Sequence, residues 1–211
     1  MLLKIIAVMI LSIVIIISIF TILYKFYFLR KPVRTIPYSR TVVSPASGRI
    51  VRILNIGNKN KETIPKGILG KVNLLVKDTV KKGYMIVIMM TPLDVHFQRS
   101  PVEGTIVSTK HSKGRFLNAV KDAGSLIALQ NEKNEIIIRN EDIGKIKIVQ
   151  VAGFLARRIR CFVKSKQKIH KGAELGLICL GSQVILIMPE LKLSVEEGQK
   201  VIDGETVIAR F

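Results

Sequence analysis

The stretch ICLGSQVILIMP, residues 178–189, joins two apolar runs through the pair Gly181-Ser182. Both runs are rich in residues typical of β-strands, whereas a strand tolerates an interior glycine only where the backbone bends or is closely approached. A β-bulge or a tight corner explains such an interruption. The other explanation is chemistry at the Gly181-Ser182 peptide bond, and the remainder of the chain is needed to choose between the two.

Short runs rich in Val and Ile follow one another from residue 41 onward, punctuated by Gly, Asn, Asp and Lys. Several alternate with a period of two, which predicts strands, and one stretch, Phe154–Cys161, predicts a short helix. No long stretch after residue 30 has helical periodicity. The sequence therefore predicts a mainly β domain. The strands expected most clearly are Ile68–Val76, Tyr84–Met90, Glu135–Ile138 and Lys145–Val151.

Two internal similarities refine this prediction. The segment Ser44–Val51 is echoed by Ser100–Val107, since both contain Ser-Pro, two residues, Gly, one residue and Ile-Val. A second pattern, a β-branched residue followed three positions later by Gly, occurs at Val80–Gly83, Ile169–Gly172 and Val201–Gly204. Short strands joined by such turns bury too little apolar surface singly, so we expect interlocked sheets in a barrel-sandwich-like domain.

The N-terminal residues 1–30 predict one transmembrane helix. Ile5–Leu23 contains no charge, and at 1.5 Å per residue it approximately spans a hydrocarbon core of about 30 Å. Aromatic residues follow it instead of the small residues of a signal-peptide cleavage site, which favours an uncleaved anchor. Basic residues are denser after it than before it, so the positive-inside rule puts the main domain on the cytoplasmic side of the cell membrane. We expect a connector at 31–40 and the domain at 41–211.

The chain is strongly basic, with a net charge of +19, of which residues 31–211 carry +16. Such a domain is attracted to polyanions, and next to a membrane anchor an anionic phospholipid surface is the expected one. Nucleic acid is not expected, because the chain lacks Trp, has only 6% aromatic residues and shows no zinc-finger or RNA-binding signature. Cys161 and Cys179 have no Cys or His at metal-ligand spacing, so we expect core cysteines and no metal.

Several segments, taken in order, resemble the phosphatidylserine decarboxylase family, specifically its short bacterial and archaeal branch with archaetidylserine decarboxylases. Each segment is weak alone, and their joint order over residues 38–211 is a strong signal. They are Ser44-Pro45-Ala46-Ser47-Gly48, residues 91–99 (TPLDVHFQR), Pro101-Val102-Glu103-Gly104, residues 131–134 (NEKN), residues 149–153 (VQVAG) with Ala156-Arg157-Arg158-Ile159, Gly181-Ser182, and residues 204–209 (GETVIA).

This resemblance implies a proenzyme that cleaves itself between Gly181 and Ser182 into a β chain, 1–181, and an α chain, 182–211, which stay associated. Ser182 would become a pyruvoyl group, a covalent cofactor whose ketone withdraws the electrons released when a serine phospholipid loses CO₂. The product would be the ethanolamine phospholipid, and no metal or pyridoxal phosphate would be needed. The family also implies a homodimer.

The same resemblance assigns the site residues. His96 is the candidate base for the Ser182 hydroxyl, because imidazole accepts and returns a proton near neutrality. The family usually has Asp where this chain has Ser47, and by analogy with other triads the loss of an orienting carboxylate slows the step by up to about 10⁴-fold. Asp94 and Glu103 are candidate substitute carboxylates. Arg157 and Arg158 are candidates for the phosphate or carboxylate of the headgroup.

Three alternatives remain open at this point. A membrane-anchored barrel-sandwich module without catalysis is favoured by Ser47. A lipoyl- or biotinyl-type carrier would use Lys192 at a hairpin tip, although Leu191 and Leu193 beside it do not resemble a carrier motif. A nucleic-acid-binding protein would rest on charge alone.

Overall fold

The computed structural model describes residues 1–57, 75–114, 130–153, 158–179 and 182–211, and of Leu2 and Ser182 it describes the backbone only. The chain divides into two compact units, Met1–Pro32 and Val33–Phe211. The first consists of the α-helix α1, Leu2–Ile22, continued by a π-helical segment η1, Leu23–Phe28.

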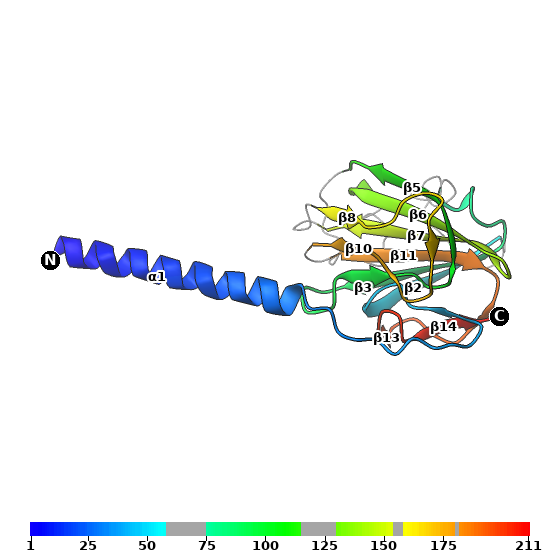
Figure 1. Cartoon of the computed structure of the whole chain (residues 1–211), viewed down its shortest axis with the longest axis horizontal. Helices are drawn as coiled ribbons and strands as arrows, with labels where there is room; N and C mark the ends of the chain where they lie inside the picture. The colour runs from blue at the N-terminus through cyan, green and yellow to red at the C-terminus, as the bar shows by residue number, and fades with distance from the viewer. Residues whose placement is uncertain (58–74, 115–129, 154–157, 180–181) are drawn as a thin grey trace. The chain divides into compact units, whose positions relative to one another are not determined.

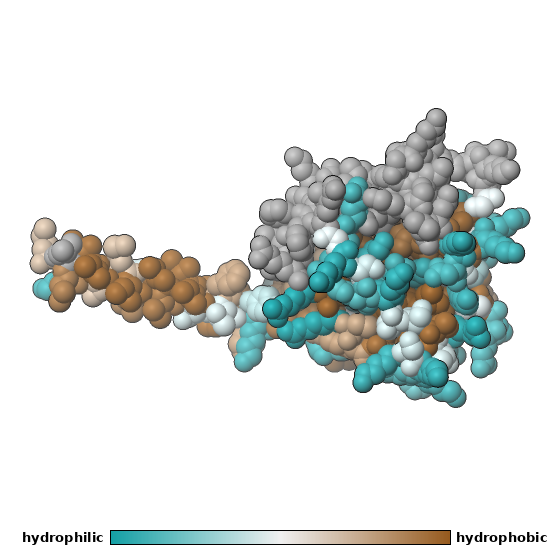
Figure 2. Space-filling view, turned by 90° about the horizontal axis from the view of Figure 1, so that it is seen from above, coloured by the Kyte–Doolittle hydropathy of each residue, from teal (hydrophilic) through white to brown (hydrophobic). Residues whose placement is uncertain are grey.

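Helix α1 is apolar apart from Lys4 and three residues that carry hydroxyl groups. The stretch Leu3–Phe28 contains an 18-residue window with a mean hydropathy of 3.2 and could cross a membrane by length and composition. Its hydroxyl groups do not break this pattern, because Ser12, Ser18 and Thr21 each donate to the carbonyl four residues earlier at 2.8–2.9 Å. The face of the helix seen in the space-filling view is mostly in the hydrophobic colour, with hydrophilic colour near both ends (Figure 2). The predicted N-terminal helix is thus confirmed as an element.

The second unit is built from strands, and the predicted mainly β fold is confirmed (Figure 1). An eight-stranded antiparallel sheet in the order β13-β2-β3-β11-β7-β6-β5-β9 curls around two three-stranded sheets, β1-β14-β12 and β4-β10-β8. The strands are β1 Thr41–Val43, β2 Gly48–Ile56, β3 Gly83–Met90, β4 Phe97–Arg99, β5 Gly104–Ser112, β6 Lys133–Asn140, β7 Gly144–Ala152, β8 Ile159–Cys161, β9 Lys168–Ile169, β10 Glu174–Ile178, β11 Ser182–Pro189, β12 Lys192–Leu193, β13 Lys200–Val201 and β14 Val207–Arg210.

Strand β11 lies inside the large sheet, between β3 and β7, and is buried on both faces. Val184, Leu186 and Met188 join the main apolar cluster, which also takes residues from the small sheets. The alternate residues Ile185 and Ile187 join a second cluster on the other face of the sheet. Because successive side chains of a strand point to opposite faces, a continuous apolar run such as VILIM is what a strand covered on both sides requires.

The repeated Ser-Pro segments form the same turn twice. The Ser44 hydroxyl donates to the carbonyl of Ala46 at 2.7 Å, and the Ser100 hydroxyl donates to that of Val102 at 2.6 Å. In both turns the following glycine lies so close to a neighbouring strand that a Cβ would stand 2.2–2.3 Å from a carbonyl oxygen. The sequence repeat is therefore a structural repeat that starts β2 and β5.

Two local predictions are wrong where the structure describes them. Leu75 and Val76, the end of the predicted strand 68–76, lie in a helical turn whose apolar side chains cover the second cluster; residues 68–74 lie outside the described residues. Ile159–Cys161, the end of the predicted helix 154–161, forms β8 against β10; residues 154–157 are not described. Packing of an apolar face in the first case, and pairing with β10 in the second, decides the conformation against a local pattern. The other three predicted strands are confirmed as β3, β6 and β7.

Candidate functional site

The junction between β10 and β11 is where the predicted cleavage bond falls. β10 ends at Ile178 in a three-stranded sheet, and β11 begins at Ser182 in the eight-stranded sheet. The backbone of Ser182 pairs with Met90 of β3 and Ala152 of β7. Gly181 and the Ser182 side chain lie outside the described residues. The connection between the two strands therefore crosses from one sheet to another, and no described ladder bond joins β10 to β11.

His96 lies beside this junction, in the segment between β3 and β4. It is fully buried, and its backbone carbonyl accepts a hydrogen bond from the Ile178 amide at 3.3 Å. Its ring nitrogen Nδ1 lies 2.8 Å from the carbonyl oxygen of Asp94. Because a carbonyl only accepts, Nδ1 carries the hydrogen, and in the neutral ring Nε2 carries the lone pair. The ring is thus held in the tautomer that a base acting through Nε2 needs.

Asp94 orients His96 through its backbone, while its carboxylate has another partner. Oδ2 accepts from both the amide and the hydroxyl of Thr91, each at 2.8 Å. These two bonds close the turn 91–94 and hold its carbonyls in place. The described contact of Asp94 with the His96 ring is therefore the carbonyl contact.

Ser47 belongs to a buried charged cluster with Asp203, a residue that the sequence did not single out. Its hydroxyl donates to Asp203 Oδ1 at 2.5 Å, and Asp203 is completely buried. Two guanidinium groups pair with the same carboxylate, Arg34 at 2.6 Å and Arg99 at 2.9 Å. A buried carboxylate needs such compensation, so Ser47 here serves the ion cluster. Asp203 stands in the third of the repeated turn patterns, which gave no signal for a buried charge.

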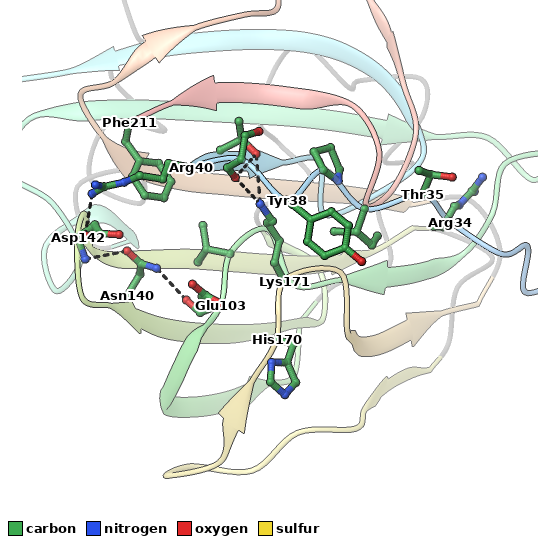
Figure 3. A pocket seen from close by; sticks show the side chains of 15 residues that line it. Arg34, Thr35, Tyr38, Arg40, Glu103, Asn140, Asp142, His170, Lys171 and Phe211 are labelled. Atoms are coloured by element: carbon green, nitrogen blue, oxygen red, sulfur yellow. Dashed lines mark hydrogen bonds and ion pairs between the residues drawn. The ribbon is translucent and has the colours of Figure 1, made fainter.

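Glu103, the other candidate carboxylate, is exposed and lines a pocket of about 640 Å³ between the segment 34–41 and the turn before β5 (Figure 3). Lys171 faces it there and donates to the Ser39 carbonyl at 2.7 Å. Burial lowers the Lys171 pKa from its ordinary value, and the Glu103 charge partly opposes this. Among the described residues that line this pocket, His96 is absent. Glu103 is thus grouped with Lys171 and not with His96.

Arg158 is the one of the two candidate headgroup residues that the structure describes, since Arg157 lies outside the described residues. Its side chain is exposed, and its backbone carbonyl accepts from the Cys179 amide at 3.2 Å. The backbone of Arg158 therefore lies beside the β10–β11 junction, since its partner Cys179 is three residues before Ser182.

Comparison with known proteins matches the sequence of this chain to a family. A sequence model described as "Phosphatidylserine decarboxylase" matches residues 23–209. A phosphatidylserine decarboxylase proenzyme of Chlorobium limicola is 37% identical over 196 residues, covering 92% of this chain and 82% of that protein. Putative archaetidylserine decarboxylase proenzymes of Methanothermobacter thermautotrophicus and Methanocaldococcus jannaschii are 35% and 38% identical, covering 89% of this chain and 81% and 89% of theirs. The chain belongs to the phosphatidylserine decarboxylase family.

Proposed function

We propose that this protein decarboxylates a serine phospholipid, phosphatidylserine or archaetidylserine, to the corresponding ethanolamine phospholipid after cleaving itself at Gly181-Ser182. The observation that carries the proposal is the family match over nearly the whole chain, to relatives named decarboxylase proenzymes. These relatives favour the enzyme over a non-catalytic binding module with the same scaffold.

The proposed maturation uses groups of the chain itself. The Ser182 hydroxyl attacks the Gly181 carbonyl and gives its proton to His96 Nε2, and the peptide amide becomes an ester. Elimination then breaks the ester bond and releases Gly181 as a carboxylate at the end of the β chain. Addition of water to the dehydrated residue releases its nitrogen as ammonia and leaves a ketone at the start of the α chain. Glycine at position 181 offers the attacking hydroxyl the least steric resistance.

The fold is compatible with a break at this bond. From Ser182 onward β11 has a partner on each side, pairing with β3 through Pro189 and with β7 through Ile187. The short α chain would thus remain an internal strand of the large sheet after cleavage. Since β10 and β11 belong to different sheets, the break removes no described ladder pairing.

The donor set near the junction fits a pyruvoyl group derived from Ser182, because that residue starts a fixed strand beside a buried imidazole. When formed, such a group supplies a carbonyl that takes up the electrons left by the departing CO₂. Arg158 and its neighbour Arg157 would hold the phosphate or carboxylate of the headgroup by charge-assisted hydrogen bonds. His96 would hold or deliver the proton that replaces CO₂.

The proposed location is the cell membrane, with the decarboxylase domain in the cytoplasm. The apolar helix supplies an anchor, and the basic residues that follow it agree with the positive-inside rule. The net charge of +19 would favour an anionic lipid surface, which is also where a serine phospholipid is found.

Intact-mass spectrometry of the purified full-length protein and its Ser182→Ala variant tests this function. We expect two fragments from the parent, the smaller starting at residue 182 with a blocked amino terminus, and one uncleaved chain from Ser182→Ala. The parent, but not the variant, should release CO₂ from vesicles of phosphatidylserine or archaetidylserine. A parent chain that stays intact and inactive through long incubation with such vesicles would refute the proposal.

A further inference from the structure

Three buried side-chain amides form a line of hydrogen bonds that ends on His96. The Asn134 amide donates to Gln150 Oε1, the Gln150 amide donates to Gln98 Oε1, and the Gln98 amide donates to the His96 carbonyl. Each of these bonds is 2.7 Å long. The three residues come from β6, β7 and β4, and none is more than 3% exposed.

The direction of this line is fixed by its end. A backbone carbonyl only accepts, so Gln98 must turn its NH₂ group toward His96 and its oxygen toward Gln150. Gln150 must then present its own NH₂ group to Gln98 and its oxygen to Asn134. Every amide therefore donates toward His96, and a change of donor to acceptor at Gln150 cannot be absorbed by a simple flip of one side chain.

The surroundings of this line of amides are apolar. Gln98 Nε2 lies 3.8 Å from the sulfur of Met90, a member of the main apolar cluster, and both neighbours of Gln150 in the same face of β7, Ile148 and Ala152, belong to it as well. Apolar side chains of the same shape in place of both partners of a buried hydrogen bond can be nearly neutral or even stabilising. An amide line in this setting therefore needs a reason other than stability.

The neighbouring strand leaves room for the line. Gly176 of β10 lies so close that a Cβ added to it would stand 2.7 Å from Gln150 Nε2 and 2.3 Å from the carbonyl oxygen of Arg160. The backbone of β10 also reaches His96, through the Ile178 amide. Thus β10, the strand that leads to Ser182, and the amide line hold the same His96 carbonyl from two directions.

We propose that Gln98, Gln150 and Asn134 are positioning residues that fix the backbone of His96, and through it the imidazole, for proton transfer at Ser182. The inference rests on the proposed self-cleavage. The Asp94 carbonyl sets the ring tautomer, while the amide line sets where the ring stands. A misplacement of about 1 Å in a reacting group can slow a step by about 10²-fold. We therefore expect loss of the line to slow self-cleavage by roughly 10- to 100-fold.

Time courses of self-cleavage in the full-length protein, kept in detergent micelles and followed by intact mass, test this inference. Gln150→Met keeps the side-chain volume but removes two of the three bonds, and should slow cleavage by a factor that does not change with pH. Gln150→Glu should be slow at pH 8 and approach the parent rate as pH falls. A protonated carboxyl donates to Gln98 from its hydroxyl and still accepts from Asn134, and burial raises the pKa of such a group toward neutrality.

The matched control is Asn140→Ala, at the other end of β6. Asn140 is also buried and donates to the Glu103 carbonyl at 3.0 Å, so its loss reports the general cost of removing a buried amide. We expect parental cleavage from this variant. A parent that does not cleave overturns the proposed function and the inference with it. If the parent cleaves, three results would each overturn the inference alone. They are a Gln150→Met variant that cleaves as fast as the parent, a Gln150→Glu variant whose rate does not approach the parent rate at low pH, and an Asn140→Ala variant that is slowed as much as Gln150→Met.

Discussion

Removal of the Asp203 charge is the perturbation with the clearest structural consequence. The carboxylate is wholly buried and accepts from three side chains, those of Ser47, Arg34 and Arg99. Both guanidinium groups are themselves mostly buried, with side chains 12% and 15% exposed. In Asp203→Asn the shape is kept, but the two cations lose their counter-charge and one of them meets an NH₂ group in place of an oxygen.

The expected cost follows from this burial. Breaking a buried ion pair by removing one partner costs about 3–5 kcal/mol, because the remaining charge is left without compensation. Two cations share this carboxylate, so the upper half of that range applies if neither side chain escapes to water. For a domain of 150–250 residues each 1 kcal/mol lowers the Tm by about 2–4 °C, so a loss of about 4–5 kcal/mol gives a fall of roughly 8–20 °C.

Urea unfolding of the full-length protein in detergent micelles, followed by the β-sheet signal in circular dichroism, measures this cost. The control is Asp142→Asn, because Asp142 pairs with Arg40 at 2.8 Å but the two side chains are 47% and 67% exposed. An exposed pair contributes about 0–1 kcal/mol, so the control should unfold almost as the parent does. If the two variants lose the same free energy of unfolding, the claim that burial makes the Asp203 cluster strong is refuted.

Two further changes test the packing of β10 at Gly176 and the ion pair of Asp78 with Lys147. Gly176→Ala should destabilise the protein by about 1–3 kcal/mol and slow self-cleavage, since the added methyl group would press on the Arg160 carbonyl and the Gln150 amide; a freely cleaving, fully stable variant would show that β10 can shift aside. Asp78→Asn tests a pH effect: burial raises the Asp78 pKa, but the hydrogen bond and charge of Lys147 outweigh it and hold the pKa below 3.8. The carboxylate therefore stabilises the fold above its unfolded pKa and stops doing so as pH falls through the lower folded value. The variant should be less stable than the parent at pH 7, by under about 1 kcal/mol for this half-exposed group, and the difference should shrink as pH falls below 3.8. A difference that does not shrink in acid would refute the assignment.

The parts of the fold that followed from sequence are those where local pattern and final environment agree. The run 184–188 is apolar at every position, and the structure covers it on both faces. The two Ser-Pro turns could be predicted from the sequence repeat, and the same hydroxyl-to-carbonyl hydrogen bond forms in each. The strand order of the large sheet could not be predicted from sequence, because the pairing of β11 with β3 and β7 joins segments separated by many residues. The two local errors arose where a partner strand or an apolar face overrode the pattern.

The candidate site divides in the same way. His96 could be proposed from sequence because its motif is contiguous; the structure buries it beside Ile178, and its catalytic role stays a prediction. Asp203 was missed because nothing near it in sequence marks a buried charge, and Gln150 because its partner Gln98 lies on a strand distant in sequence. A search for polar residues inside apolar strands would have found Gln150, because the two residues on each side of it in β7 are apolar.

The effect of Ser47 in place of the family's usual Asp depends on what else holds His96. An orienting carboxylate in a triad does two things: it holds the imidazole in one tautomer and place, and it stabilises the imidazolium that forms. The first task is met here without a carboxylate, because the Asp94 carbonyl binds Nδ1 and Gln98 holds the backbone of His96. The second is not met by a neutral carbonyl. We therefore expect the departure at Ser47 to slow self-cleavage by less than the roughly 10⁴-fold loss seen when a triad loses both tasks together.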